Sequence, residues 1–295
     1  MSDGRAPRST RTITTLAVLA LALITLGLVA ATHHRSQAAT ATSTPPHVIV
    51  ISPPTTSDAA AYIQAALNGA PSGSTVQLPA GTFSLVADHV IGGDLDCNLN
   101  VPDGVTIKGA GIGQTVLVGN GSTSCNVVAA VHASGITVTN CTASSDYRHG
   151  FRFYGLDASH RVTNFAVSGC SARNNGEDGY LLDYIAASTL SDCTATGNGA
   201  DGFELCGTSG VTIDRCTASG QANPYSSGFV CDGDAATFGP TSGNTISNCT
   251  ASGNDYGYRE WQGGGGNVVY GNWFPNNTNG SEFAPGTIQF ANVLR

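Results

Sequence analysis

Two recurring signals in the sequence predict an all-β fold, a right-handed parallel β-helix with three short strands per turn. A segment that ends in cysteine recurs at Cys141, Cys170, Cys193, Cys216 and Cys249. Between these segments, a glycine followed by an aromatic residue recurs at intervals of 29, 23, 26 and 29 residues, at Gly150-Phe151, Gly179-Tyr180, Gly202-Phe203, Gly228-Phe229 and Gly257-Tyr258. Such a repeat is typical of a solenoid, whose corresponding strands stack about 4.8 Å apart into parallel sheets. The right hand follows from the normal twist of strands.

The residues around each cysteine predict a bend between two strands of every turn. Valine, leucine or isoleucine lies three residues before each cysteine, and alanine lies two residues after it, so all these positions suit the core. Strict alternation along one strand cannot bury them all, whereas a bend just before the cysteine can. The five bend residues are mostly types that tolerate a left-handed backbone: Asn140, Gly169, Asp192, Arg215 and Asn248.

The N-terminal region predicts export and a capped first turn. Three arginines precede an apolar run, so residues 1–31 are interpreted as a signal peptide or a membrane anchor, and residues 32–54 as a polar linker. The β-helix domain is expected over residues 55–295, outside the cytoplasm. Ser57 or Asp58 can begin a short capping helix that runs to about Leu67. Four of its residues are expected on one side, namely Tyr62, Ile63, Ala66 and Leu67.

Charge and cysteine content narrow the possible partners. The net charge is −8, and cleavage after Ala31 would remove three arginines and one aspartate, which makes it −10. Such an acidic chain is a poor nucleic-acid binder, because the phosphates of nucleic acids attract basic surfaces. We expect a monomer with no protein partner. The five recurring cysteines are expected inside the solenoid. Export makes a disulfide plausible for Cys206 with Cys231 or for Cys97 with Cys125. No spacing resembles a zinc site.

Period-two alternation along the glycine–aromatic strands predicts one outer face rich in ionisable and aromatic groups. The aromatic residue faces inward, so two outward positions follow on each strand. These positions hold Arg152, Leu181, Glu204, Val230 and Arg259, and then Tyr154, Asp183, Cys206, Asp232 and Trp261. The strand starts are bordered by His149, Asp178 and Asp201. The alternative is a solvated face with ordinary turn aspartates. No cofactor is assigned, and calcium is a cation that carboxylates near turns can bind.

These residue types suit chemistry on a sugar polymer. On a uronate, Arg152 or Arg259 would neutralise the substrate carboxylate while His149 or Tyr154 removes the neighbouring proton. The outcome would be a lyase or an epimerase. On a neutral glycan, Asp183 and Asp232 would act as acid and base, since two strand spacings of about 4.8 Å place them near the separation of inverting hydrolases. Trp261 and Tyr154 would stack on sugar rings.

The segments NGEDGYLLDY (residues 175–184) and ADGFELCGTS (residues 200–209) resemble the catalytic module of secreted mannuronan C5-epimerases. The wider resemblance, to pectate-lyase-like β-helices, covers about residues 55–290. It implies a catalytic Asp183. The family's preceding turn reads Tyr-Gly-Phe-Asp-Pro-His-Glu with catalytic Tyr, Asp and His. At those three positions this chain has His149, Arg152 and Tyr154, an altered signature in which the Tyr and His have exchanged places.

Three functional hypotheses follow. The first is a secreted lyase or C5-epimerase that acts on a uronate-containing polymer. The others are a glycoside hydrolase on the same fold and a non-catalytic carbohydrate-binding solenoid. In all of them the expected partner is a polysaccharide. The expected catalytic residues are Asp183, His149, Tyr154 and Arg152, and the expected substrate-binding residues are Glu204, Asp232, Arg259, Trp261, Asp178 and Asp201.

Overall fold

A computed structural model describes residues 47–52, 57–86, 96–119, 125–233 and 237–294 of the chain. The predicted signal peptide or anchor, and most of the predicted linker, lie outside these residues. Within the described ranges, no helix has both the length and the apolar character needed to cross a membrane.

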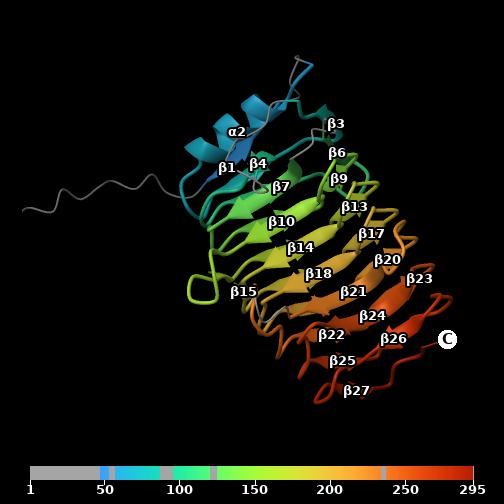
Figure 1. Cartoon of the computed structure of the whole chain (residues 1–295). Coiled ribbons are helices and arrows are strands. Elements are labelled where there is room, and N and C mark those ends of the chain that lie inside the picture. The colour runs from blue at the N-terminus through green and yellow to red at the C-terminus, as the bar shows by residue number, and fades with distance from the viewer. Residues whose placement is uncertain (1–46, 53–56, 87–95, 120–124, 234–236, 295) are drawn as a thin grey trace, which may run out of the picture. The chain divides into compact units, whose positions relative to one another are not determined.

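Every pairing between the named strands is parallel, and the strands stack into three long sheets (Figure 1). One turn of the solenoid contributes one strand to each sheet, as predicted. The ten-stranded sheet comprises, in spatial order, β1 (Val48–Val50), β2 (Thr75–Gln77), β5 (Thr106–Lys108), β8 (Thr137–Thr139), β12 (Ala166–Ser168), β16 (Thr189–Ser191), β19 (Thr212–Asp214), β22 (Thr245–Ser247), β25 (Val268–Tyr270) and β27 (Ile288–Phe290). The β-branched β1 pairs with β2, so the sheet begins inside the predicted linker.

The seven-stranded sheet follows the ten-stranded sheet after a sharp bend. It comprises β3 (Gly81–Ser84), β6 (Thr115–Val118), β9 (Thr142–Ser144), β13 (Ser171–Arg173), β17 (Thr194–Thr196), β20 (Thr217–Ser219) and β23 (Thr250–Ser252). All five predicted bend residues have φ between 51° and 57°. Arg215 adopts this conformation too, although an arginine there carries a steric cost that glycine would avoid.

The eight-stranded sheet carries the glycine–aromatic strands. It comprises β4 (Cys97–Asn100), β7 (Asn126–Val131), β10 (Phe151–Tyr154), β14 (Tyr180–Asp183), β18 (Phe203–Cys206), β21 (Ser227–Asp232), β24 (Tyr256–Trp261) and β26 (Gly280–Glu282). The aromatic residues of the glycine–aromatic pairs are fully buried, as predicted, namely Phe151, Tyr180, Phe203, Phe229 and Tyr258. The rings of Phe151, Tyr180, Phe203 and Phe229 stack in sequence at centroid distances of 5.0, 4.6 and 5.0 Å. A two-stranded sheet, β11 (Val162–Thr163) with β15 (Ile185–Ala186), lies apart from these three.

The predicted capping helix is α2 (Ala60–Gly69). The Asp58 carboxylate accepts a hydrogen bond of 2.9 Å from the Ala60 backbone N–H, and Ile63 and Leu67 are buried. Tyr62 is 48% exposed, which corrects its predicted place on the buried side, because one residue of helix turns a side chain by about 100° from its neighbour. The Gln64 side chain donates a hydrogen bond to the Asn100 backbone C=O and accepts one from the Asn100 backbone N–H. The helix thereby provides hydrogen-bond partners for the edge strand that begins the eight-stranded sheet.

Buried amide side chains form a ladder in the turns that lead into the eight-stranded sheet. The Asn198 side-chain oxygen accepts the Asn175 backbone N–H at 3.2 Å, and Gln221 accepts that of Asn198 at 2.9 Å. The Asn254 side chain accepts a hydrogen bond of 3.1 Å from the Gln221 backbone N–H, and the Asn277 side chain accepts one of 3.1 Å from the Asn254 backbone N–H. The ladder satisfies backbone donors that no strand partner reaches. It was not predicted from the sequence.

The five recurring cysteines are buried in the solenoid, as predicted. A disulfide between Cys206 and Cys231 is wrong, and both residues have free thiols. Cys231 lies opposite the inward Leu205, whereas Cys206 lies opposite Asp232, so the two sulfur atoms lie on opposite faces of the sheet. Cys97 and Cys125 are both buried near the start of the solenoid.

Candidate functional site

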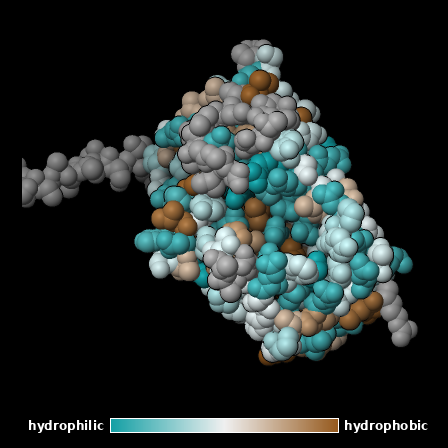
Figure 2. Space-filling model, viewed as in Figure 1, coloured by the Kyte–Doolittle hydropathy of each residue, from teal (hydrophilic) through white to brown (hydrophobic). Residues whose placement is uncertain are grey.

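The strand register builds the predicted outer face of the eight-stranded sheet, hereafter the acidic face. Pairing across β10, β14, β18, β21 and β24 aligns the first outward column as Arg152, Leu181, Glu204, Val230 and Arg259. The second outward column is Tyr154, Asp183, Cys206, Asp232 and Trp261. Figure 2, in the same view as Figure 1, shows a mostly hydrophilic surface with isolated apolar side chains.

His149, a predicted base, lies below this surface and is only 2% exposed. Its Nδ1 atom is 3.0 Å from the Asp178 carboxylate, and its Nε2 atom is 3.0 Å from the Glu177 carboxylate. Burial disfavours the imidazolium, but the two carboxylates outweigh burial and raise the pKa of His149. Arg148 completes the row through an ion pair of 3.0 Å with Glu177. His149 therefore contacts two carboxylates, and bulk solvent hardly reaches it.

Arg152 and Asp183, both predicted as catalytic, form a buried ion pair. The Arg152 Nη2 and Nε atoms are 2.9 and 3.2 Å from one Asp183 oxygen. Burial raises the pKa of Asp183 even though the Arg152 guanidinium opposes this shift. The pairing directs the Arg152 guanidinium toward a protein carboxylate.

Tyr154 is half-buried in a small aromatic group at the end of β10. Its ring lies 5.4 Å from the Arg152 guanidinium carbon and 6.4 Å from the Tyr184 ring centroid. The exposed His132 lies 5.7 Å away on the neighbouring turn. Tyr154 and His149 lie at opposite ends of β10, because Tyr154 is its last residue and His149 lies two residues before its first.

Three carboxyl groups meet at the strand starts. Asp178, Asp201 and Glu204 have side-chain oxygens within 4.8 Å of one another. Burial alone would raise the pKa of Asp178, but the hydrogen bond and charge of His149 outweigh burial and lower it. Burial and the negative charge of Asp178 raise the pKa of Asp201 to about 7. Burial, Asp178 and Asp201 raise the pKa of Glu204 well above its usual range. The protonated form of Glu204 is therefore favoured more strongly than in an ordinary glutamate.

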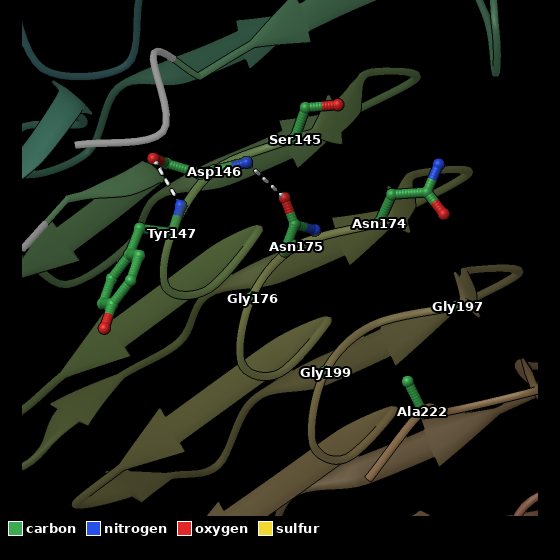
Figure 3. A pocket seen from close by; sticks show the side chains of 9 residues that line it. All are labelled: Ser145, Asp146, Tyr147, Asn174, Asn175, Gly176, Gly197, Gly199 and Ala222. Carbon is green, nitrogen blue, oxygen red and sulfur yellow. Dashed lines mark hydrogen bonds between the residues drawn. The ribbon is translucent and has the colours of Figure 1, made fainter. Parts of the chain in front are cut away.

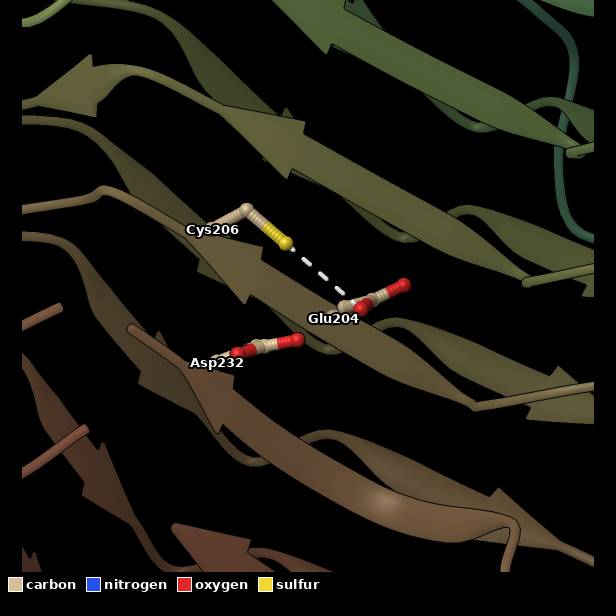
Figure 4. A group of neighbouring side chains, drawn as sticks. All are labelled: Glu204, Cys206 and Asp232. Carbon is tan, nitrogen blue, oxygen red and sulfur yellow. Dashed lines mark hydrogen bonds between the residues drawn. The ribbon is translucent and has the colours of Figure 1, made fainter. Parts of the chain in front are cut away.

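A second group shares Glu204. The ligand atoms of Glu204, Cys206 and Asp232 also lie within 4.8 Å of one another, and the Cys206 sulfur is 3.5 Å from Glu204 Oε1 (Figure 4). Three carboxylates offer the oxygen donors that calcium prefers, whereas a thiolate beside two carboxylates suits zinc better. Burial and the neighbouring carboxylates raise the pKa of the Cys206 thiol, so the neutral thiol is favoured.

Arg259 and Trp261 lie at the C-terminal end of the same face. The Arg259 guanidinium carbon is 3.6 Å from the centroid of the Trp261 ring, and its Nε atom is 3.0 Å from Glu282. Trp261 is 39% exposed and lies opposite Asp232 in the register. An exposed indole beside a carboxylate suits a sugar ring, which has apolar faces and hydroxyl edges.

Sequence reasoning missed the partners of the predicted residues, namely Glu177, Arg148 and Glu282. A signal for two of them was present. Gly150 and Gly179 directly precede aligned strands, so the residues before them align as well. This register places His149 beside Asp178 and Arg148 beside Glu177. The direction of the Arg152 side chain, by contrast, depends on its rotamer and left no trace in the spacing.

The sequence model of the family described as "Right handed beta helix region" matches residues 103–274. A search of curated proteins found no significant match. Among solved structures, the pectate lyase Pel9A superimposes with a TM-score of 0.52 and 14% identity over 85% of this chain and 77% of the lyase. The catalytic domain of a GH87 alpha-1,3-glucanase in complex with nigerose superimposes with a TM-score of 0.51 and 15% identity, over 78% of this chain and 45% of the glucanase chain.

The A-module of the Azotobacter vinelandii mannuronan C-5 epimerase AlgE6 covers 80% of this chain and 95% of the module, at 18% identity and a TM-score of 0.40. At such low identities the pectate lyase and the glucanase show a shared fold and no more.

Proposed function

The chain belongs to the right-handed β-helix family, and on that premise we propose that it is a glycoside hydrolase that cleaves a neutral polysaccharide. The acid is Glu204 and the nucleophile is Asp232. The export signal expected in residues 1–31 would bring the enzyme to polymers outside the cell. Action on a polysaccharide is also compatible with the fold, since a pectate lyase and an alpha-1,3-glucanase share it.

The observation that carries this proposal is a carboxyl group with a raised pKa next to a second carboxyl group. Glu204 has a pKa well above its usual range, and a side-chain oxygen of Asp232 lies within 4.8 Å of it. Retaining glycosidases use two carboxyl groups about 5–5.5 Å apart, and inverting enzymes need about 6.5–9.5 Å. The Glu204–Asp232 pair therefore fits retention. The predicted Asp183–Asp232 pair is less suited, because Asp183 is buried against Arg152.

The reaction follows from these two groups. Glu204 donates its proton to the glycosidic oxygen while an Asp232 oxygen attacks the anomeric carbon, so the glycosidic bond breaks and a glycosyl–enzyme ester forms. Water then attacks the same carbon, and the Glu204 carboxylate takes a proton from it. The ester bond breaks and both side chains return to their starting states. Asp178, held as an anion by His149, is a positioning residue that keeps the proton on Glu204.

The electrostatics of the acidic face favour a neutral substrate. A uronate lyase or epimerase must neutralise the substrate carboxylate, but Arg152 is paired with Asp183 and Arg259 with Glu282. The carboxyl groups of Asp178, Asp201 and Asp232 lie on this face, and negative charge on them would repel a polyuronate. Hydrolysis needs no such neutralisation.

The product distinguishes the hypotheses. We expect the purified protein, assayed with and without calcium, to release reducing ends from at least one neutral polymer among xylan, laminarin and dextran. No absorbance from an unsaturated uronate should appear with polygalacturonate or alginate. Proton NMR during the first turnovers should show a retained anomeric configuration. Unsaturated products would support a lyase instead, and binding without any turnover would support a non-catalytic solenoid.

A further inference from the structure

A hollow lies in the turns that lead into the eight-stranded sheet, next to the acidic face. This turn groove has a volume of about 550 Å³. Figure 3 shows that it crosses successive turns of the solenoid. It is lined by Ser145, Asp146, Tyr147, Asn174, Asn175, Gly176, Gly197, Gly199 and Ala222.

The floor of the turn groove consists of backbone and small side chains. A Cβ atom at Gly176 would overlap the Tyr147 carbonyl group, and one at Gly199 would overlap the Gly176 carbonyl group. Stacking of the turns therefore admits only glycine at these two positions. Ala222 is the next small residue along the floor. The result is a flat strip in which successive turns lie about 4.8 Å apart, comparable to the length of a pyranose unit.

One aromatic side chain stands at the end of this strip. Tyr147 is 51% exposed, although its backbone N–H is fixed by a hydrogen bond of 2.8 Å to the Asp146 carboxylate. Asp146 is in turn attached to the amide ladder, because its backbone N–H donates to Asn175 at 3.3 Å. An exposed ring on a rigid backbone gives a stacking surface at a low cost in conformational entropy.

The turn groove lies next to the strand starts of the acidic face. Gly176 precedes Asp178 by two residues, and Gly199 precedes Asp201 by two residues, on adjacent turns. A polymer that leaves the acidic face across the strand starts, toward the preceding turns, would therefore meet the groove. Asp146 is the one charged residue among those that line it, so the groove suits an uncharged chain with many hydroxyl groups.

We propose that the turn groove is a second carbohydrate-binding site, in which Tyr147 stacks on a sugar unit of a neutral polysaccharide chain. This inference rests on the proposed hydrolase function and deepens it, because it assigns a subsite remote from the bond that is cleaved. Binding energy from the groove would hold the polymer and leave a short substrate unaffected.

The test is binding to polymers, measured on the Glu204→Gln background so that nothing is cleaved. In affinity gels that contain xylan, laminarin or dextran, the parent should be retarded by at least one polymer. Tyr147→Ala should weaken that retardation by about tenfold in apparent Kd, and Tyr147→Trp should restore it. Tyr62→Ala is the matched control, since Tyr62 is similarly exposed on the distant α2, and its retardation should equal that of the parent.

A second arm separates this inference from the proposed function. With Glu204 intact, Tyr147→Ala should raise the KM for the polymer and leave kcat for a short aryl glycoside unchanged. Equal retardation of the parent and Tyr147→Ala would overturn the groove assignment, whether or not the wild-type protein cleaves the polymer. So would the absence of retardation by every neutral polymer. If Glu204→Gln loses cleavage while Tyr147→Ala behaves as wild type, the hydrolase proposal is supported and the groove assignment is wrong.

Discussion

The ten-stranded and eight-stranded sheets share one backbone pattern and have very different outer faces. On the ten-stranded sheet, the outward column repeats nearly one residue type, through Thr137, Ala166, Thr189, Thr212 and Thr245. On the eight-stranded sheet, the corresponding column changes at every strand, from Arg152 to Leu181, Glu204, Val230 and Arg259. Both inner faces are mostly apolar.

The difference separates outward residues that the sheet alone explains from outward residues that need a functional explanation. A threonine ladder suits a solvated parallel sheet and needs no further explanation. A face that buries charges and brings carboxyl groups together gives up stability, and such sites are expected where a protein has a function. The predictions below test whether the two faces differ in energetics as they do in composition.

The largest expected effect is on stability, at the buried ion pair. Arg152→Leu should lower the free energy of unfolding by about 3–5 kcal/mol, because Asp183 would remain buried without its partner. Arg215→Leu breaks an ion pair with Asp192 in which both side chains are more than half exposed, so it should cost about 0–1 kcal/mol. Urea unfolding measures both. Equal losses would mean that the Arg152–Asp183 pair is solvated, and replacing both partners by leucine should recover much of the stability.

The inner faces should respond alike. Leu182 lies in β14 of the eight-stranded sheet and Leu190 in β16 of the ten-stranded sheet, and both are fully buried. Leu182→Ala and Leu190→Ala should each cost about 2–5 kcal/mol, through lost burial and the cavity left behind. Thr189→Ala, on the outer face beside Leu190, should change stability by less than about 0.5 kcal/mol. A much smaller loss in Leu182→Ala would show that the interior is loosely packed behind the acidic face.

The acidic face should make stability depend on pH. Asp201 has a pKa of about 7 in the folded protein against about 3.9 when unfolded, so from pH 4 to pH 7 the folded state holds a proton that the unfolded state has lost. The free energy of unfolding therefore falls as pH rises through this window. Asp201→Asn should remove this loss and raise Tm at pH 8 by about 3–6 °C, with little change near pH 4.

Asp192→Asn provides the control for that experiment. The pKa of Asp192 is lowered by the hydrogen bond and charge of Arg215, so its replacement should give no gain at pH 8. A gain of equal size in both variants would trace the effect to the net charge of the chain, and Asp201 would then have no special role.

The smallest expected signal is the reactivity of the cysteines in the native protein. Burial raises the pKa of the Cys170 thiol, and the hydrogen bond with Cys216 together with burial raises the pKa of the Cys193 thiol. The five recurring cysteines are enclosed in the solenoid. Maleimide should leave these five unmodified until the protein is denatured, as judged by mass spectrometry of peptides. Rapid modification of several of them in the folded state would contradict the assigned bends.

The sequence predicted most of the fold because each signal had a single physical solution. A cysteine and an alanine could both be buried only if the chain bent at residues such as Asp192 and Arg215, and the positive φ values confirm this. The outward columns followed from alternation alone. The exposure of Tyr62 did not, because a short helix that is largely apolar gives a weak periodic signal.

The candidate site was predictable in position but not in its internal pairing. Alternation identified Glu204 and Asp232 as outward residues, and the register made them neighbours. Whether Arg152 reaches a substrate or Asp183, and whether His149 faces solvent or Glu177, depends on rotamers and burial that spacing does not encode. The roles assigned to His149 and Tyr154 by resemblance stay predictions.

The most direct test compares one carboxylate on each outer face. The measurement is the rate at which reducing ends are released from a neutral polysaccharide by wild type, Glu204→Gln and Asp214→Asn, from pH 5 to pH 10. Asp214 lies outward in β19 of the ten-stranded sheet. We expect Glu204→Gln to lose about 10²–10⁴-fold in rate and Asp214→Asn to stay within about twofold. The wild-type rate should fall only at a pH above the usual titration range of a glutamate, because the raised pKa of Glu204 keeps the acid protonated through that range. A Glu204→Gln rate close to wild type, or equal losses in both variants, would contradict the account.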